Sequence, residues 1–237
     1  MRFDTTRWSI VLRSRDGGEH ARAALEILCR TYRPPVLAYI RCRRHDPDAA
    51  EDLTQAFFVE FLAHAFHADA DPARGRFRAF LLTALNRFLI DVDQQSRAVK
   101  RGGRIRFTSF EQSFRGDHSA ALPHHDETPE RTFERVWALA LIDSAVRRLR
   151  EEAVEANKAE MFDLLGEFLI ERPDDADYTR VAAVLNLRRN TLATAIHRLR
   201  HRLRELIRQE LAQTVASDAE LESEMYDLRV VLRGIME

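Results

Sequence analysis

The chain has 237 residues, of which 45% are hydrophobic and 32% charged, and its net charge is only −1. This composition is typical of a folded soluble protein with one large domain or two small ones. No apolar run approaches the roughly 18 residues of a membrane-spanning helix. The N-terminus also lacks the apolar segment of a secretory signal. We therefore expect a cytoplasmic protein without membrane insertion.

Low glycine and proline contents, 8 and 7 residues, favour long helices over sheets. Apolar spacing predicts a short helix at residues 5–15, with Trp8 facing inward, and a longer helix at 20–44. Pro34-Pro35 is expected to kink or break the longer helix. The cysteines at 29 and 42 lack CxxC spacing, so we expect free, buried thiols in a reducing compartment.

The next predicted helix, residues 46–62, is acidic. Asp46 can cap it and Pro47 suits its first position. From residue 46 to 60 there are five acids and no lysine or arginine. Adjacent carboxylates could form an acid–base pair or bind a metal, but no histidine, cysteine or further acid stands at ligand spacing. The pattern favours an exposed face for a basic partner, made of Asp48, Glu51, Asp52 and Gln55.

Residues 74–101 are predicted to form a long helix with one apolar side. From 74 to 104 the chain holds eight basic and two acidic residues. The polar side could contact bases and phosphates, and its members are Asn86, Arg87, Gln94, Gln95, Arg97, Lys100 and Arg101. Phe77 and Phe80 could stack on exposed bases, although their helical spacing favours the core.

Periodicity stops at residues 102–129, which read as a flexible linker. Its histidines at 118, 124 and 125 lack an ordered scaffold or a cysteine, so no metal site is expected there. Thr128-Pro129 is a typical helix start, and strongly helical patterns follow at 130–155 and 158–171.

Residues 177–208 predict two helices joined by a turn. Asp177 is the expected N-cap of the first, and Asn186 suits the turn because asparagine tolerates left-handed backbone. The second buries a stripe that begins at Leu192 and Ile196. Seven arginines against one acid lie between residues 188 and 208. This pattern indicates a helix-turn-helix whose second helix enters a DNA major groove, against the alternative of a solvated basic helix.

A last helix is expected from Ser217, because Ser217 and Glu220 have capping-box spacing. Its apolar stripe includes Leu221 and Leu228, and its opposite face is expected to be solvated, with Glu222, Glu224, Asp227, Arg229 and Arg233. The stripe favours packing on the helix-turn-helix domain. A regulatory cover over a binding surface is the alternative.

The order of acidic helix, basic helix and C-terminal helix-turn-helix resembles the sigma-70 family of RNA polymerase sigma factors, in its two-domain extracytoplasmic-function (ECF) group. The segment DPDAAEDLTQAFFVEFL (46–62) resembles region 2.2, FRAFLLTALNRFLID (77–91) and the basic stretch beyond it resemble regions 2.3 and 2.4, and YTRVAAVLNLRRNTLATAIHRLRHRLREL (178–206) resembles region 4.2.

The resemblance implies roles for these segments. The acidic set Asp48, Glu51, Asp52 and Gln55 would bind the clamp helices of the largest polymerase subunit. The set at 86–101 named above, together with Phe80 at the family's usual tryptophan position, would contact the promoter −10 element. The −35 element would be read by Arg188, Arg189, Asn190, Thr191, Thr194, His197, Arg198 and His201.

The sequence thus predicts an all-α fold of two helical domains joined by a flexible linker, the second containing a helix-turn-helix. Residues 1–101 would be a region 2 domain with an N-terminal helix, 130–212 a region 4 domain, and 213–237 a helical extension. Expected partners are core RNA polymerase, promoter DNA, and an anti-sigma factor or another regulator; the free protein is expected to be a monomer.

No nucleophile–base pair, phosphate loop or metal constellation stands out in the sequence. We therefore expect no catalytic residue, cofactor or metal. The alternatives are a stand-alone helix-turn-helix regulator and, more remotely, an enzyme with a DNA-binding appendage.

Overall fold

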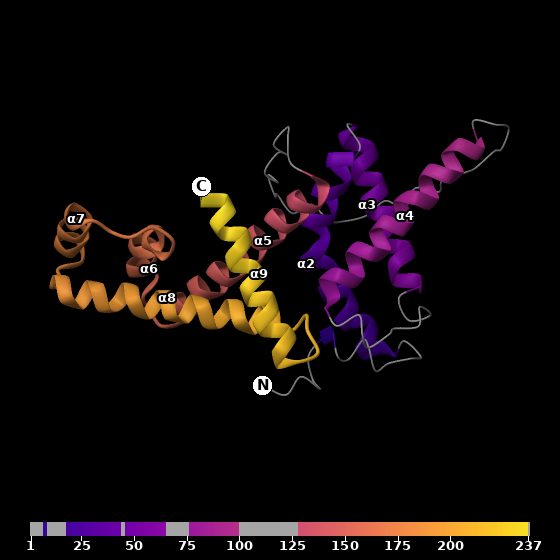
Figure 1. Ribbon diagram of the computed structural model, residues 1–237. Helices are drawn as coiled ribbons and strands as arrows, with labels where there is room; N and C mark the ends of the chain where they lie inside the picture. Colours follow the sequence, from indigo (N-terminus) through magenta and orange to yellow (C-terminus); the bar gives the residue numbers. More distant parts are fainter. Residues whose placement is uncertain (1–6, 9–17, 44–45, 65–75, 100–127, 237) are drawn as a thin grey trace. The chain divides into compact units, whose positions relative to one another are not determined.

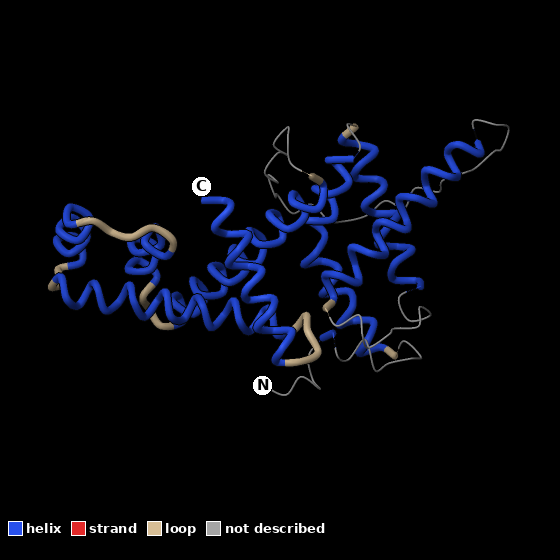
Figure 2. Tube along the Cα trace, viewed as in Figure 1, coloured by secondary structure: helices blue, strands red, loops and turns tan. Residues whose placement is uncertain are grey.

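The computed structural model describes residues 7–8, 18–43, 46–64, 76–99 and 128–236. Every regular element among these residues is a helix, and none is a strand (Figures 1 and 2). They are α2 (Glu19–Arg43), α3 (Pro47–His64), α4 (Phe77–Val99), α5 (Pro129–Glu155), α6 (Ala159–Leu165), the 3₁₀ helix η3 (Gly166–Leu169), α7 (Asp175–Leu185), α8 (Arg189–Ala212) and α9 (Asp218–Met236). The all-α prediction is confirmed. The predicted linker lies outside the described residues except for its last two.

The chain divides into two compact units. Unit 1 comprises Met1–Ala138 and Gln213–Glu237, and unit 2 comprises Leu139–Ala212. The division falls within α5 and at the end of α8, so the chain leaves unit 1 and later returns to it. Residues 130–138 and the C-terminal helix therefore group with the N-terminal segments, which differs from the boundaries expected from the sequence.

The core of unit 1 is aromatic and is formed mainly by α2, α3 and α4. The Phe77 ring lies 5.2 Å from Trp8, 5.0 Å from Tyr32 and 6.2 Å from Phe61, measured between centroids. All four side chains are buried, and such edge-to-face pairs add to the stabilisation from burial. α2 runs without interruption past Pro34 and Pro35, so the expected break is absent.

Helix starts in unit 1 follow the predicted caps. The N–H groups of Asp48 and Ala49 donate to Asp46 Oδ1 at 3.1 and 3.4 Å, and α3 begins at Pro47. The Arg131 N–H donates to Thr128 Oγ1 at 3.3 Å, and α5 begins at Pro129. These side chains satisfy backbone donors that a helix start leaves without partners.

A buried ionic cluster joins α9 to α4 within unit 1, whereas the sequence favoured packing of α9 on the helix-turn-helix domain, which it bounded at 130–212. Arg78 Nη2 lies 3.2 Å from Glu224 Oε2 and 2.9 Å from Asp227 Oδ2, and Arg78 also contacts Glu134 of α5. The Arg78 guanidinium lies 4.1 Å from the centre of the Trp137 ring. Glu224 is only 1% exposed, so it does not belong to a solvated face.

Arg76 extends this cluster, and backbone hydrogen bonds support it. Arg76 Nη1 lies 2.7 Å from Asp227 Oδ2. The Phe77 N–H donates to Thr214 O, and the Trp8 N–H to Gln213 O, both at 3.1 Å. Burial raises the pKa values of Glu134 and Glu224, although the neighbouring arginine charge opposes the rise. The two arginines therefore hold together carboxylates that burial alone would drive toward the neutral form.

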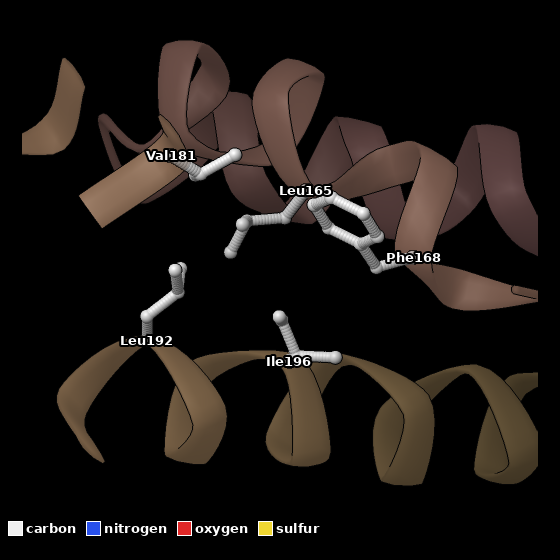
Figure 3. Close-up of a cluster of buried hydrophobic side chains, with 5 residues drawn as sticks. All are labelled: Leu165, Phe168, Val181, Leu192 and Ile196. Atoms are coloured by element: carbon white, nitrogen blue, oxygen red, sulfur yellow. The ribbon is translucent and has the colours of Figure 1, made fainter. Parts of the chain in front are cut away.

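In unit 2, α7 and α8 pack around a small apolar cluster formed by Leu165, Phe168, Val181, Leu192 and Ile196. Figure 3 shows Leu192 and Ile196 rising from α8 toward the other three side chains. The chain turns between the helices at Asn186, whose φ and ψ are 51° and 44°. This left-handed conformation is the one that the sequence predicts for Asn186.

The N-cap of α7 is Asp174, and not Asp177 as the sequence suggested. The Asp177 N–H donates to Asp174 Oδ1 at 2.7 Å, and the Asp174 N–H donates to Asp177 Oδ2 at 3.1 Å. This reciprocal capping box satisfies two backbone donors at once. Helix α9 has a related start, in which the Glu220 N–H donates to Ser217 Oγ at 3.3 Å and the Ala216 N–H donates to Glu220 Oε2 at 2.8 Å.

We predict that Arg78→Met strongly destabilises unit 1, because it keeps the side-chain bulk but removes the cation that contacts all three carboxylates of the cluster, Glu134, Glu224 and Asp227. Breaking a buried ion pair costs about 3–5 kcal/mol. Chemical denaturation would measure the loss, and hydrogen exchange should rise in α9 before it rises in α7. Arg87→Met, at an exposed position of the same helix, is the control.

The loss in Arg78→Met should depend on pH. Without the cation, burial would raise the folded-state pKa values of Glu134 and Glu224 further above the ordinary 4.5. Carboxyls with raised folded-state pKa values stabilise the fold when protonated, and this contribution is lost as the pH rises through those values. The deficit relative to wild type should therefore be largest at neutral pH and shrink on acidification. A deficit that does not change with pH would contradict this account.

We also predict opposite effects for two substitutions at Asn186. Asn186→Gly should preserve the free energy of unfolding, because glycine adopts positive φ without strain. Asn186→Val should lower it by about 1–3 kcal/mol, the cost of holding such a residue in a sparsely populated conformation. Equal melting temperatures for the two variants would rule out a conformational requirement at this turn.

Candidate functional site

The predicted acidic face of α3 is present, but its members differ in availability. Asp48, Asp52 and Gln55 are exposed on the helix. Glu51 is half-buried and forms an ion pair with Arg33 of α2. Asp48 and Asp52, one helical turn apart, are therefore the carboxylates best placed to meet a basic partner.

The predicted polar face of α4 is only partly available. Arg87, Gln94 and Gln95 are exposed, whereas Asn86 is half-buried. Asn86 Oδ1 accepts a hydrogen bond from the Tyr39 hydroxyl at 2.7 Å, and the same hydroxyl lies 2.9 Å from Glu130 Oε1. Burial raises the pKa of Tyr39 to about 12, so this hydroxyl remains a donor at neutral pH. Asn86 is thus committed to a contact inside unit 1.

Phe80 is a core residue and not an exposed aromatic. It is 6% exposed, and its ring lies 5.4 Å from Trp8 and 5.5 Å from Phe61. Phe80 therefore lies in the core, as its helical spacing favours. A base could reach its ring only if the aromatic core opened. The predicted contacts Lys100 and Arg101, and the side chain of Arg97, lie outside the described residues.

All eight predicted −35 residues lie on the exposed side of α8 or just before it. They are Arg188, Arg189, Asn190, Thr191, Thr194, His197, Arg198 and His201. The opposite side of α8 carries Leu192 and Ile196 into the apolar cluster (Figure 3). One helix therefore separates a buried stripe from a polar, basic face, as its sequence period predicts.

Three members of this face already have partners. Arg189 forms an ion pair with Asp175, and its guanidinium lies 4.9 Å from the centre of the Tyr178 ring. His201 Nδ1 lies 3.3 Å from Glu205 Oε1. The Thr194 hydroxyl donates to Asn190 O at 2.8 Å, a common bond within a helix. In unit 2, Arg188 and Arg198 have no carboxylate within ion-pair distance.

Other arginines of α8 have structural roles that their sequence does not reveal. Arg200 Nε donates to Phe168 O at 2.7 Å, and its guanidinium also donates to Glu171 O. Arg202 donates to both carboxylate oxygens of Glu152, at 2.9 and 2.7 Å. This pairing raises the pKa of Arg202 and lowers that of Glu152. The surplus of arginine counted in the sequence therefore overstates the charge available to a ligand.

Two features are absent from the part of the chain that the structure describes. Among the described residues, no group of three or more histidine, cysteine or acidic side chains is arranged to hold a metal ion. Within the same part of the chain, no helix combines the length and apolar character needed to cross a membrane. Cys29 and Cys42 are free, and Cys42 Sγ donates to Thr132 Oγ1 at 3.2 Å.

Comparison with known families gives a match for the part of the chain that includes the acidic face of α3. Residues 28–98 match the family model of sigma-70 region 2. Neither the curated proteins nor the solved structures yield a match. The matched segment covers α3 and most of α2 and α4, the same segments that pack as the aromatic core of unit 1. The match shows a sigma-70 region 2 in this part of the chain, a region found in transcription initiation factors that bind RNA polymerase and recognise promoters.

Proposed function

We propose that this chain is a sigma factor of the ECF group, in which unit 1 binds core RNA polymerase and contacts the −10 element, and unit 2 reads the −35 element. The observation that carries the proposal is the exposed acidic face of α3 inside the region 2 match, in the same chain as the exposed basic face of α8. Each face suits one of the two partners, a basic protein surface and a polyanion.

In unit 1, the exposed pair Asp48 and Asp52 suits the polymerase contact, because complementary charges guide association and select the partner. The exposed residues Arg87, Gln94 and Gln95 suit the −10 contact, since amides can pair with base edges and arginine with phosphate. Asn86 and Phe80 are weaker candidates because both are engaged within unit 1.

In unit 2, the turn between α7 and α8 and the packing of the two helices support the proposed helix-turn-helix. The left-handed turn at Asn186 and the shared apolar cluster hold α8 with its polar side outward. Arg188 and Arg198 are exposed and can reach bases or phosphates, and arginine is the commonest reader of guanine. A stand-alone regulator would leave the region 2 match unexplained.

Reconstituted transcription tests the whole proposal. The purified protein should co-elute with core RNA polymerase and should direct run-off transcription from a subset of a promoter library. A protein that shifts promoter DNA alone and does not bind polymerase would support the stand-alone regulator. Binding to neither partner would refute both functions.

We predict that Asp48→Lys/Asp52→Lys weakens binding to core polymerase by at least tenfold, because charge reversal turns attraction into repulsion at the interface. The matched control is Glu151→Lys/Glu155→Lys, which reverses two exposed acids at the same spacing on α5 of unit 2. Binding is measured with labelled protein, after circular dichroism confirms the fold. Equal loss in both double variants would indicate a general charge effect and not a polymerase contact.

We predict different consequences for two neighbouring arginines of α8. Arg198→Ala should weaken binding to the −35 element by about 1–3 kcal/mol and so lower transcription at a fixed −10 element. The free energy of unfolding should not change. Arg200→Ala should instead lower the melting temperature, because it removes hydrogen bonds to Phe168 O and Glu171 O. Normal transcription by Arg198→Ala across −35 variants would remove Arg198 from the proposed reading face.

A further inference from the structure

The first residue of α8 and the first residue of α7 form a pair at the edge of the proposed DNA-reading face. The Arg189 guanidinium contacts Asp175 Oδ1 and lies 4.9 Å from the centre of the Tyr178 ring. The side chains of Arg189 and Asp175 are 57% and 88% exposed. An arginine that could contact DNA is thus held against α7 by an anion and an aromatic ring.

Helix capping does not explain Asp175. Asp174 and Asp177 provide the two side chains of the α7 capping box, and Asp175 accepts no bond in it. A pair this exposed contributes little to stability, because water screens the charges and ordering both side chains costs entropy. All three acids suit the positive end of the helix dipole, yet only Asp175 contacts a residue of the proposed reading face.

A carboxylate in this position has a cost for DNA binding. It neutralises one arginine and adds repulsion toward nearby phosphates. An arginine fork fits a carboxylate, a phosphate or the O6/N7 edge of guanine. The carboxylate therefore competes with phosphates, which occur at every site, for the same donors. Arg189 contacts Asp175 through Nη2, so a guanine edge that meets the other guanidinium donors in this restrained position gains the contact without first freeing the side chain.

We propose that Asp175 is a positioning residue that restrains Arg189 and so increases discrimination between the preferred −35 element and other DNA. The inference rests on the proposed function, in which unit 2 reads that element. Asp175 contributes by competing for the Arg189 donors, which lowers affinity for other sequences more than for the preferred one. The Tyr178 ring completes the restraint by stacking on the guanidinium.

The first experiment measures binding of the full-length protein to a duplex of mixed sequence over a range of salt concentrations. Asp175→Asn should bind about three- to tenfold more tightly than wild type near 0.1 M salt, with a salt slope steeper by about one, as expected for one more phosphate contact. Asp163→Asn is the matched control. Asp163 also pairs with an arginine, Arg150, at 2.9 Å in unit 2, and neither residue belongs to the reading face.

The second experiment measures discrimination with core polymerase on templates that vary only in the −35 element. Asp175→Asn should reduce the ratio of transcription from the best to the median template by about three- to tenfold, because the released Arg189 gains a phosphate contact on templates that offer it no guanine edge. In an Arg189→Ala background the same substitution should have no further effect, because the restraint acts through Arg189. A change in stability alone would not produce this pattern.

The outcomes separate this inference from the proposed function. If wild type drives no promoter-specific transcription with polymerase, the proposed function fails. If wild type is active but Asp175→Asn behaves like Asp163→Asn, only the role of Asp175 fails. The same conclusion follows if Asp175→Asn changes discrimination equally with and without Arg189.

Discussion

The organisation of unit 1 depends on the ion pairs that the Arg78 guanidinium forms with Glu134, Glu224 and Asp227. This guanidinium draws carboxylates from α5 and α9 to the start of α4 and packs against Trp137. A cation this deeply buried is tolerated only when it is paired and hydrogen-bonded. The chain returns to unit 1 after α8, and the contacts of Arg78 with Glu224 and Asp227 hold α9 in that unit. The C-terminal helix is therefore an integral part of the unit that contains the region 2 match.

A buried or half-buried charge needs a partner, and this requirement separates the arginines of unit 2 into two groups. Arg200 and Arg202 are used for backbone carbonyls and for Glu152, whereas Arg188 and Arg198 remain exposed. The basic face of α8 is thus smaller than its composition implies. For the proposed contact of α8 with DNA, a smaller set of available arginines lowers the part of the affinity that is independent of sequence.

Local patterns predicted the helices well, because capping, turn and periodicity signals act over a few residues. Asp46, Thr128 and Ser217 begin helices as expected, and Asn186 adopts the left-handed turn. The predicted N-cap of α7 was three residues too late. Asp174 and Asp177 carry the same side chain, so only the backbone conformation decides which of them is the N-cap. The region 2 match covers the segment in which the sequence placed the acidic helix.

The sequence by itself determined the all-α class, the acidic face of α3 and the amphipathic period of α8, since each follows from spacing along one helix. Only the tertiary structure decided which polar side chains are available. Glu224 lies on the polar side of α9 by sequence, yet it is buried because Arg76 and Arg78 compensate its charge. Glu51, Asn86 and Arg189 likewise resemble free surface residues until Arg33, Tyr39 and Asp175 are brought beside them. Such pairings join residues far apart in sequence, so no local pattern encodes them.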